Sequence, residues 1–246
     1  MIFLELVPRD LDNLTRLSKQ SLARHSLITG INIPDIKRIN IRSYEAVRHL
    51  LEHNIRCLAH IRSQDSTLDE HIEIISPLVD LGLTEILIIS GDPIKPGVVP
   101  TYKSTVLELV SELKSKFDFL NVYCGFDPYR QELNTEINYA YEKLAAGCDG
   151  LFSQPFFDIE LADTVLSAFN HTQFFAGIAP VTTKASFEYW INVNKVAFPD
   201  TFKLDFEYNY KLAQELIGLA TSYAQHCYLM PIRMPVAEYL SGVFSH

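Results

Sequence analysis

Long apolar runs and clustered basic residues are both missing from this sequence of 246 residues. A membrane-spanning helix needs about 20 consecutive apolar residues, and no window approaches that length, so we expect no membrane span. The amino-terminal run MIFLEL is too short for a signal peptide, which predicts a cytoplasmic protein. Lysine and arginine total 21 against 30 acidic residues, a net charge of −9, and no stretch concentrates them. This composition argues against nucleic acid as a partner.

Cysteine is also scarce, and no two cysteines form a C-x-x-C pair. The four cysteines are Cys57, Cys124, Cys148 and Cys227. Most of them lie in apolar surroundings, which predicts buried free thiols in a reducing compartment rather than disulfides. The sequence has no metal-ligand spacing and no nucleophile elbow, so we expect no bound metal.

A glycine-rich phosphate-binding turn is absent as well. The first strand-like run ends in ELVPRD, without G-x-G-x-x-G, which argues against a doubly wound open sheet. What the sequence does have is a regular alternation of β-rich and amphipathic runs. Strands are predicted at residues 2–6, 27–33, 55–61, 84–90, 120–126, 149–154, 172–178 and 227–232. Helices are predicted at residues 10–24, 43–53, 67–82, 104–117, 134–147, 158–169, 183–194, 206–225 and 235–243.

This alternation predicts the fold class. Eight strand-like runs, each followed by a helix, are typical of a single α/β (β/α)₈ TIM barrel with parallel strands. The segment 206–225 is then an extra helix before the last strand. No linker divides the chain, so we predict one domain over residues 1–246. The aromatic residues of 206–225 could pack on a second copy of the chain, giving a homo-oligomer.

Polar residues gather at the predicted carboxyl ends of the strands, where barrel proteins carry their chemistry. With the glycines and the phenylalanine that stand among them, the residues at these strand ends are Glu5, Asn32, Asp35, His60, Arg62, Ser90, Gly91, Asp92, Gly125, Phe126, Asp127, Arg130, Gln154, Thr183, Lys184 and Arg233. Leu4 and Leu6 flank Glu5, so strand alternation turns Glu5 into the barrel. A carboxylate there is costly unless it is used or paired, which favours a functional role. The set as a whole predicts a mouth for a polar heterocycle, with one acid for proton transfer.

Several members of this set have structural explanations that stay open. His60 could be a satisfied core histidine, and Asp92 could cap a turn. Gln154 could brace a loop instead of binding a flat heterocycle. Arg130 and Arg233 could form surface ion pairs.

Five stretches together resemble the methylenetetrahydrofolate reductase family. They are FLELVP (3–8), ISGDP (89–93), AAGCDGLFSQPFFD (145–158), GIAPVTT (177–183) and MPIRMPVAEYL (230–240). The resemblance implies a barrel that binds FAD at the strand ends. It also implies the reduction of methylenetetrahydrofolate, a folate derivative, to methyltetrahydrofolate, with hydride from NAD(P)H passing through the flavin.

The resemblance also assigns roles to individual residues. It implies that Glu5 is the general acid, that Asp92 lies beside the flavin and folate rings, and that Gln154 binds the pterin. Other positions fall where the family contacts FAD, with Glu136 on the ribose side and Arg130 and Lys143 as phosphate donors. These positions are His60, Ser90, Gly91, Tyr102, Phe126, Arg130, Glu136, Lys143 and Arg233.

The substrate wall departs from the family pattern. Thr183 and Lys184 are assigned to substrate binding, but Lys184 stands where the family has a stacking phenylalanine. Pro34 stands where the family has a threonine. Two alternatives therefore stay open: a pterin-dependent methyltransferase or folate-binding partner protein on the same barrel, and an assembly protein with a relict site.

Overall fold

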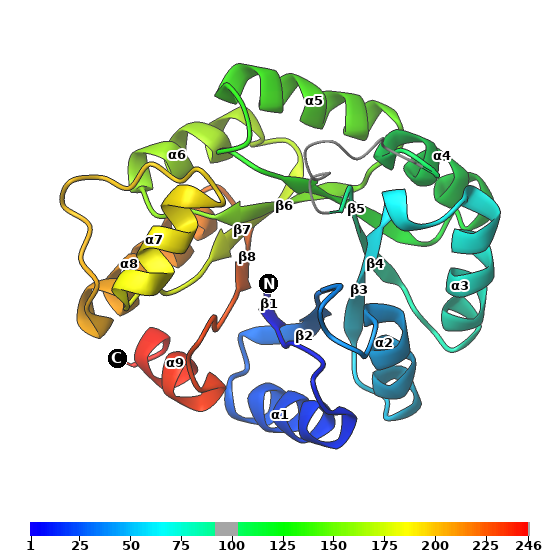
Figure 1. Cartoon of the computed structure of the whole chain (residues 1–246), viewed down its shortest axis with the longest axis horizontal. Helices are drawn as coiled ribbons and strands as arrows, with labels where there is room; N and C mark the ends of the chain where they lie inside the picture. Colours follow the sequence, from blue (N-terminus) through cyan, green and yellow to red (C-terminus); the bar gives the residue numbers. More distant parts are fainter. Residues whose placement is uncertain (92–102, 246) are drawn as a thin grey trace.

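The strands of the chain form a closed parallel barrel (Figure 1). The structure is a computed structural model that describes residues 1–91 and 103–245. Around the ring the strands follow sequence order, and β1 pairs with both β2 and β8, which closes the barrel. The strands are Ile2–Glu5 (β1), Ile28–Ile33 (β2), Cys57–Arg62 (β3), Glu85–Ile89 (β4), Asn121–Phe126 (β5), Gly150–Pro155 (β6), Gln173–Ile178 (β7) and His226–Leu229 (β8).

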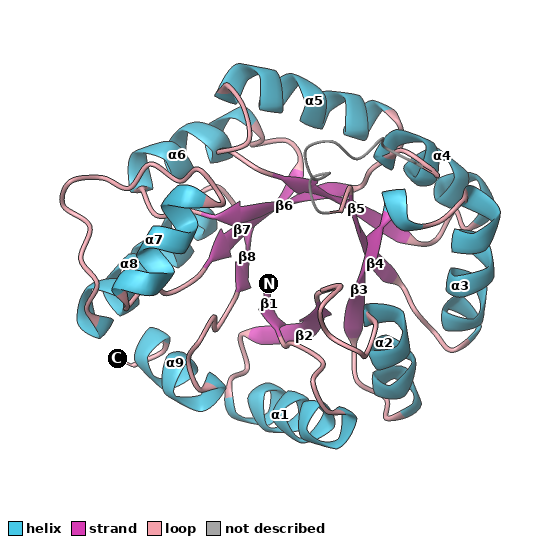
Figure 2. Ribbon diagram, in the orientation of Figure 1, coloured by secondary structure: helices cyan, strands magenta, loops and turns pink. Residues whose placement is uncertain are grey.

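Helices surround the ring of strands (Figure 2). They are Leu11–Arg24 (α1), Ser43–Glu52 (α2), Leu68–Asp80 (α3), Val106–Lys116 (α4), Leu133–Ala145 (α5), Ile159–Ala168 (α6), Lys184–Asn192 (α7), Phe206–Ser222 (α8) and Val236–Val243 (α9), with a short 3₁₀ helix at Ser63–Asp65 (η1). Both α7 and α8 lie between β7 and β8, so the (β/α)₈ barrel with its extra helix is confirmed.

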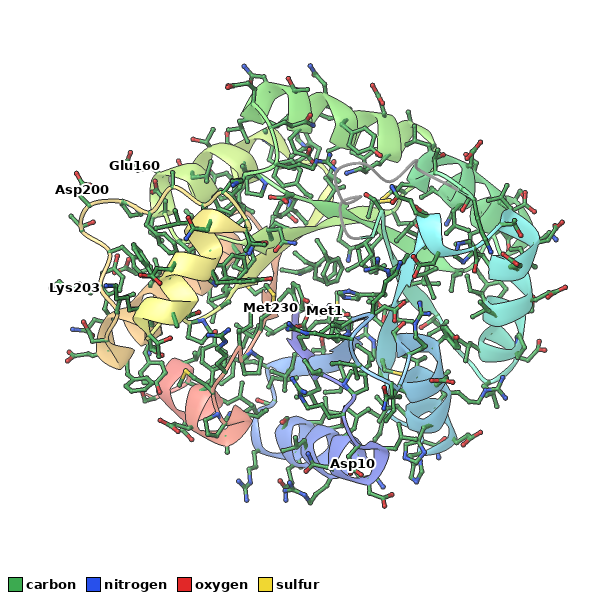
Figure 3. The ribbon with its side chains drawn as sticks, viewed as in Figure 1. Met1, Asp10, Glu160, Asp200, Lys203 and Met230 are labelled. Carbon is green, nitrogen blue, oxygen red and sulfur yellow. The ribbon has the colours of Figure 1, made fainter. Side chains whose placement is uncertain are left out.

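Alternating residues of each strand build two apolar layers. On β2, Ile31 and Ile33 pack into the layer between strands and helices. The barrel interior is filled largely by aromatic rings, with Phe152 stacked on Phe175 at 4.0 Å and Phe3 edge-on at 5.6 Å from Phe175. Figure 3 shows the side chains crowding this centre, near the labelled Met1 and Met230. Because the interior is packed, a ligand site has to lie at an end of the barrel.

The last strand is shorter than predicted. β8 ends at Leu229, because Pro231 has no N–H for a ladder and Ile232 N–H instead closes a tight turn onto the Met230 carbonyl at 2.7 Å. All four cysteines are free and buried, as expected. Within residues 1–91 and 103–245, no helix is long and apolar enough to cross a membrane.

Candidate functional site

Three neighbouring strands turn polar side chains toward the inside of the barrel at their carboxyl ends. Glu5 of β1 pairs in register with Asn32 of β2, and Asn32 pairs with Leu58 of β3. Leu58 belongs to the interior layer, and His60 follows it by two residues on the same face. Glu5, Asn32 and His60 therefore meet at one side of the barrel mouth.

Glu5 is partly buried and accepts a hydrogen bond from the phenol of Tyr228 on β8. Burial raises the pKa of Glu5 to about 7, and the Tyr228 hydrogen bond opposes part of that rise. A carboxyl group with this pKa exchanges protons readily at neutral pH. Glu5 thus has the property that a general acid needs.

Asn32 and His60 are buried, and each has a side-chain polar atom without a hydrogen-bond partner among the described residues. Asn32 is fully buried, and neither its Oδ1 nor its Nδ2 has a partner within the described residues. The Nε2 of His60 is likewise unpartnered, and burial lowers the pKa of His60 to about 4, so the ring is neutral. Unpaired buried polar groups are uncommon in proteins, and one that faces a barrel mouth is a candidate for ligand contact.

Gln154 lies at the rim of the same mouth. Its side chain is exposed, next to a register irregularity between Phe152 and Pro155 where β6 pairs with β7. The strands approach closely here, because a Cβ on Gly177 would lie 2.6 Å from the Ser153 carbonyl. The Gly177 N–H also donates to Ser153 Oγ at 2.8 Å. This tight contact fixes the backbone that carries the Gln154 amide.

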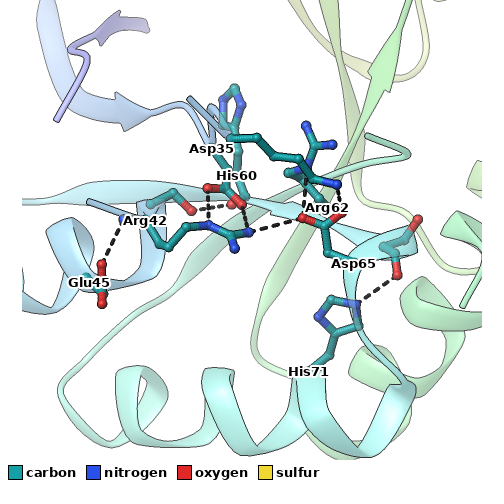
Figure 4. Close-up of polar contacts among 10 residues, drawn as sticks. Asp35, Arg42, Glu45, His60, Arg62, Asp65 and His71 are labelled. Carbon is teal, nitrogen blue, oxygen red and sulfur yellow. Dashed lines mark hydrogen bonds and ion pairs between the residues drawn. The ribbon is translucent and has the colours of Figure 1, made fainter. Parts of the chain in front are cut away.

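Ion pairs join the loops that follow β2 and β3 (Figure 4). Arg42 makes a bidentate contact with Asp35, with its Nε 2.8 Å from Oδ1 and its Nη2 2.6 Å from Oδ2. Asp65 bridges Arg42 at 3.2 Å and the Nε of Arg62 at 3.0 Å. Below it in the figure, His71 contacts the Ser63 carbonyl at 3.0 Å. The network braces the loops beside His60.

A second charged cluster joins β5 to α5. Glu136 is fully buried and accepts hydrogen bonds from Arg130 and Gln131. The Nζ of Lys143 donates to the Gly125 carbonyl at 2.7 Å and lies 3.6 Å from Glu136. Burial lowers the pKa of Lys143, while the charge of Glu136 opposes the change. Arg130, Glu136 and Lys143 are thus brought together, and the single carboxylate of Glu136 is shared by the two cations.

The β4 end carries a conformational requirement for glycine. Ser90 and Gly91 are partly buried directly after β4, and Gly91 has a φ of +113°. A Cβ there would lie 3.0 Å from Nη2 of Arg62. Both the left-handed backbone and the close approach therefore suit glycine. Asp92 and Tyr102, which were predicted to contact the flavin, lie outside the described residues.

The remaining predicted positions lie away from the inner mouth or at its rim. The Phe126 side chain packs in the outer layer, 5.4 Å from the ring of Phe169, so β5 offers only its backbone at this point. Thr183 caps α7 by accepting from Ser186 N–H at 3.2 Å. Lys184 is exposed and lies 3.8 Å from Glu188. Arg233 is exposed and has a φ of 58°.

The sequence patterns assign no role to Tyr228 and do not place Asn32 among the binding residues. A signal for Asn32 was present, because alternation along GINI (30–33) sets it opposite Ile31 and Ile33. The contact between Tyr228 and Glu5 depends on how the first and last strands pair, which no local pattern encodes.

The fold defines a (β/α)₈-barrel protein, and its polar mouth at the carboxyl ends of the strands is the candidate ligand site. The sequence profile of methylenetetrahydrofolate reductase matches residues 19–226. The chain therefore belongs to the methylenetetrahydrofolate reductase family, as its motifs predicted. No curated protein sequence matches it.

The chain also resembles solved structures at low sequence identity, and two of them illustrate the likeness. An uncharacterized protein from Clostridium thermocellum, which binds two copies of 5-methyl-5,6,7,8-tetrahydrofolic acid, aligns with a TM-score of 0.71 at 14% identity over 99% of this chain and 92% of that one. Oxaloacetate acetylhydrolase in complex with oxalate aligns with a TM-score of 0.60 at 8% identity over 98% and 78%. At these identities the matches support the barrel fold alone.

Proposed function

We propose that the chain reduces methylenetetrahydrofolate to methyltetrahydrofolate, with FAD as cofactor and NAD(P)H as the source of hydride. The observation that carries the proposal is Glu5, whose pKa lies near 7 in the mouth of a barrel of this family. Methylenetetrahydrofolate accepts hydride only after a ring nitrogen is protonated and the bridge opens to an iminium. A carboxyl group that is protonated at neutral pH can supply that proton.

The other mouth residues have roles that fit this chemistry. Tyr228 donates to Glu5, which fixes the orientation of the carboxyl group. Gln154 offers a donor and an acceptor at the rim, and a pterin ring presents both kinds of group. The bound folate of the Clostridium thermocellum protein, a barrel of similar shape, supports a reduced folate as the ligand class.

The residues of the chain suit the flavin ring of FAD better than they suit its ribose and phosphate groups. The unpartnered groups of Asn32 and His60 suit a flat polar ring, and FAD would supply the hydride there. Glu136 and Lys143, assigned to the ribose and phosphate, are buried against each other. Arg130 is the exposed member of that cluster and is the residue that would hold a phosphate.

The burial of Lys143 against Glu136 favours a second candidate function. Because Glu136 already neutralises Lys143, the chain could bind a reduced folate without a flavin. In that case it would be a folate-binding or methyl-transferring protein on the same barrel. Titration with FAD separates the two candidates, since only the first requires a protein that takes up the flavin.

The role of Glu5 is tested by the variant Glu5→Gln. We expect the rate of methyltetrahydrofolate formation to fall about 10²–10⁴-fold, the usual worth of a general acid. Oxidation of NAD(P)H by a dye in the presence of FAD should be unchanged, because that half-reaction needs no proton from Glu5. Equal rates of folate reduction in the two proteins would overturn the assignment.

A further inference from the structure

The carboxamide of Asn32 is a polar group that makes no hydrogen bond to the part of the chain that the structure describes. The residue is fully buried, and both polar atoms of its side chain are unpartnered among the described residues. An amide can donate two hydrogen bonds and accept two, so this position leaves its whole capacity unfilled. A buried polar group without hydrogen bonds destabilises the ligand-free protein, which indicates that a bound ligand supplies the missing partners.

A second buried asparagine shows what a structural amide looks like in the same chain. Asn209 is 3% exposed, and its Oδ1 accepts from Val181 N–H at 2.8 Å. Its Nδ2 lies 3.2 Å from the Val181 carbonyl, 3.1 Å from that of Lys203 and 2.8 Å from that of Asp205. The fold surrounds this amide with partners, so the lack of partners for Asn32 among the described residues is a local feature.

The placement of Asn32 directs its amide to the ligand mouth. Gly30 precedes Asn32 by two residues and therefore lies on the same face of β2. It faces the barrel interior, because a Cβ on Gly30 would lie 2.5 Å from the ring of Phe3, which belongs to the interior layer. Asn32 is therefore the last inward residue of β2, beside Glu5 in register. The unpartnered Nε2 of His60 comes from the next strand on the same inner side.

We propose that Asn32 binds the reacting ring of the ligand and helps to select it, with His60 as a second contact. The chemistry that satisfies a primary amide is a ring with an N–H donor next to a C=O acceptor, which pairs with the amide through two hydrogen bonds. Such a cyclic amide occurs in the pterin of a folate and in the ring of a flavin. The proposal rests on the proposed function, because it concerns the same mouth.

The test compares Asn32→Leu with Asn209→Leu in the full-length protein. Affinities for 5-methyltetrahydrofolate and for FAD are measured by titration calorimetry, and Tm is measured without ligand. We expect Asn32→Leu to keep or raise Tm and to lose at least about tenfold in affinity for one of the two ligands, the worth of two neutral hydrogen bonds. Asn209→Leu should lower Tm and, well below it, leave both affinities unchanged.

Each outcome bears on the proposal. Loss confined to the folate assigns Asn32 to the pterin, and loss confined to FAD assigns it to the flavin. Unchanged affinity for both ligands, or a Tm that falls as far as in Asn209→Leu, overturns the proposal. If Asn32→Leu does not fold, Asn32→Ala removes the same amide without adding bulk.

Product formation tests the proposed function, and the dependence of ligand binding on Asn32 tests this inference, so the two can fail separately. A wild-type protein that forms methyltetrahydrofolate but shows no dependence on Asn32 retains the function and loses the inference. A protein that forms no product, yet binds a ligand through Asn32, loses the function and retains the inference. A wild-type protein that binds neither ligand contradicts both.

Discussion

Glu5 acquires its acid–base behaviour from its neighbours in the barrel mouth. Burial raises the pKa of the carboxyl group, and the Tyr228 phenol lowers it again in part. Because the folded-state pKa lies above the ordinary value of 4.5, the protein binds this proton more tightly when folded. The stabilisation is complete below pH 4.5 and disappears as the pH rises through about 7.

This linkage predicts a pH-dependent effect of Glu5→Gln on stability. Relative to the variant, the wild type should lose up to about 3 kcal/mol of unfolding free energy between pH 4.5 and pH 8. His60 contributes with the opposite sign, since its lowered pKa costs stability in acid, but it is common to both proteins and cancels in the difference. Urea unfolding at several pH values measures the difference, and parallel profiles for the two proteins would contradict it.

The inward orientation of Glu5 could be predicted from the sequence. Leu4 and Leu6 on either side of Glu5 were enough to turn the carboxyl group inward. They could not predict Tyr228, which is 223 residues away in the chain and meets Glu5 only when β1 pairs with β8. Nor does any sequence pattern reveal that Asn32 is left without partners among residues 1–91 and 103–245, because that depends on every neighbouring element.

At the scale of elements, the junction of β5 and α5 determines how the charged residues around Glu136 can be used. Arg130 and Lys143 both lie over the ring of Tyr139, the latter at 4.1 Å from its centroid, and both contact the buried carboxylate. A buried cation that loses its partner is strongly destabilising. The cluster therefore supports the packing of α5 on the barrel, whatever it binds.

We expect Glu136→Gln to lower the unfolding free energy by about 3–5 kcal/mol, because it leaves Lys143 buried beside a neutral amide. Glu132→Gln is the matched control, since Glu132 is exposed at the start of the same helix and makes no side-chain cap. Chemical denaturation of both variants measures the effect. Equal losses in the two would mean that Glu136 does not stabilise the folded chain.

Element boundaries were predictable wherever a local signal fixes them. The capping box of α3 is such a signal, with Thr67 N–H donating to Glu70 at 2.7 Å and Glu70 N–H donating to Thr67 Oγ1 at 3.3 Å. η1 was not predicted, because a single 3₁₀ turn leaves no periodic pattern. The end of β8 was misplaced because the apolar run continues through Pro231 into a turn.

At the scale of the whole molecule, the alternation of strands and helices was sufficient to predict a closed (β/α)₈ barrel. The packed aromatic interior then confines ligand binding to the strand ends. The profile match over residues 19–226 covers most of the barrel but leaves out β1 and the later part of β8. Glu5 and Tyr228 lie in those strands, so their role depends on geometry and on the predicted motif rather than on the profile.

We propose that a folate is reduced at this barrel mouth through bound flavin. The most direct measurement loads the full chain with FAD, reduces it anaerobically with NADH or NADPH, and then adds methylenetetrahydrofolate. We predict that the yellow absorbance of oxidised flavin returns and that methyltetrahydrofolate forms in equal amount. A flavin that is reduced by NAD(P)H but not reoxidised by methylenetetrahydrofolate, or a chain that takes up no FAD, would contradict the claim.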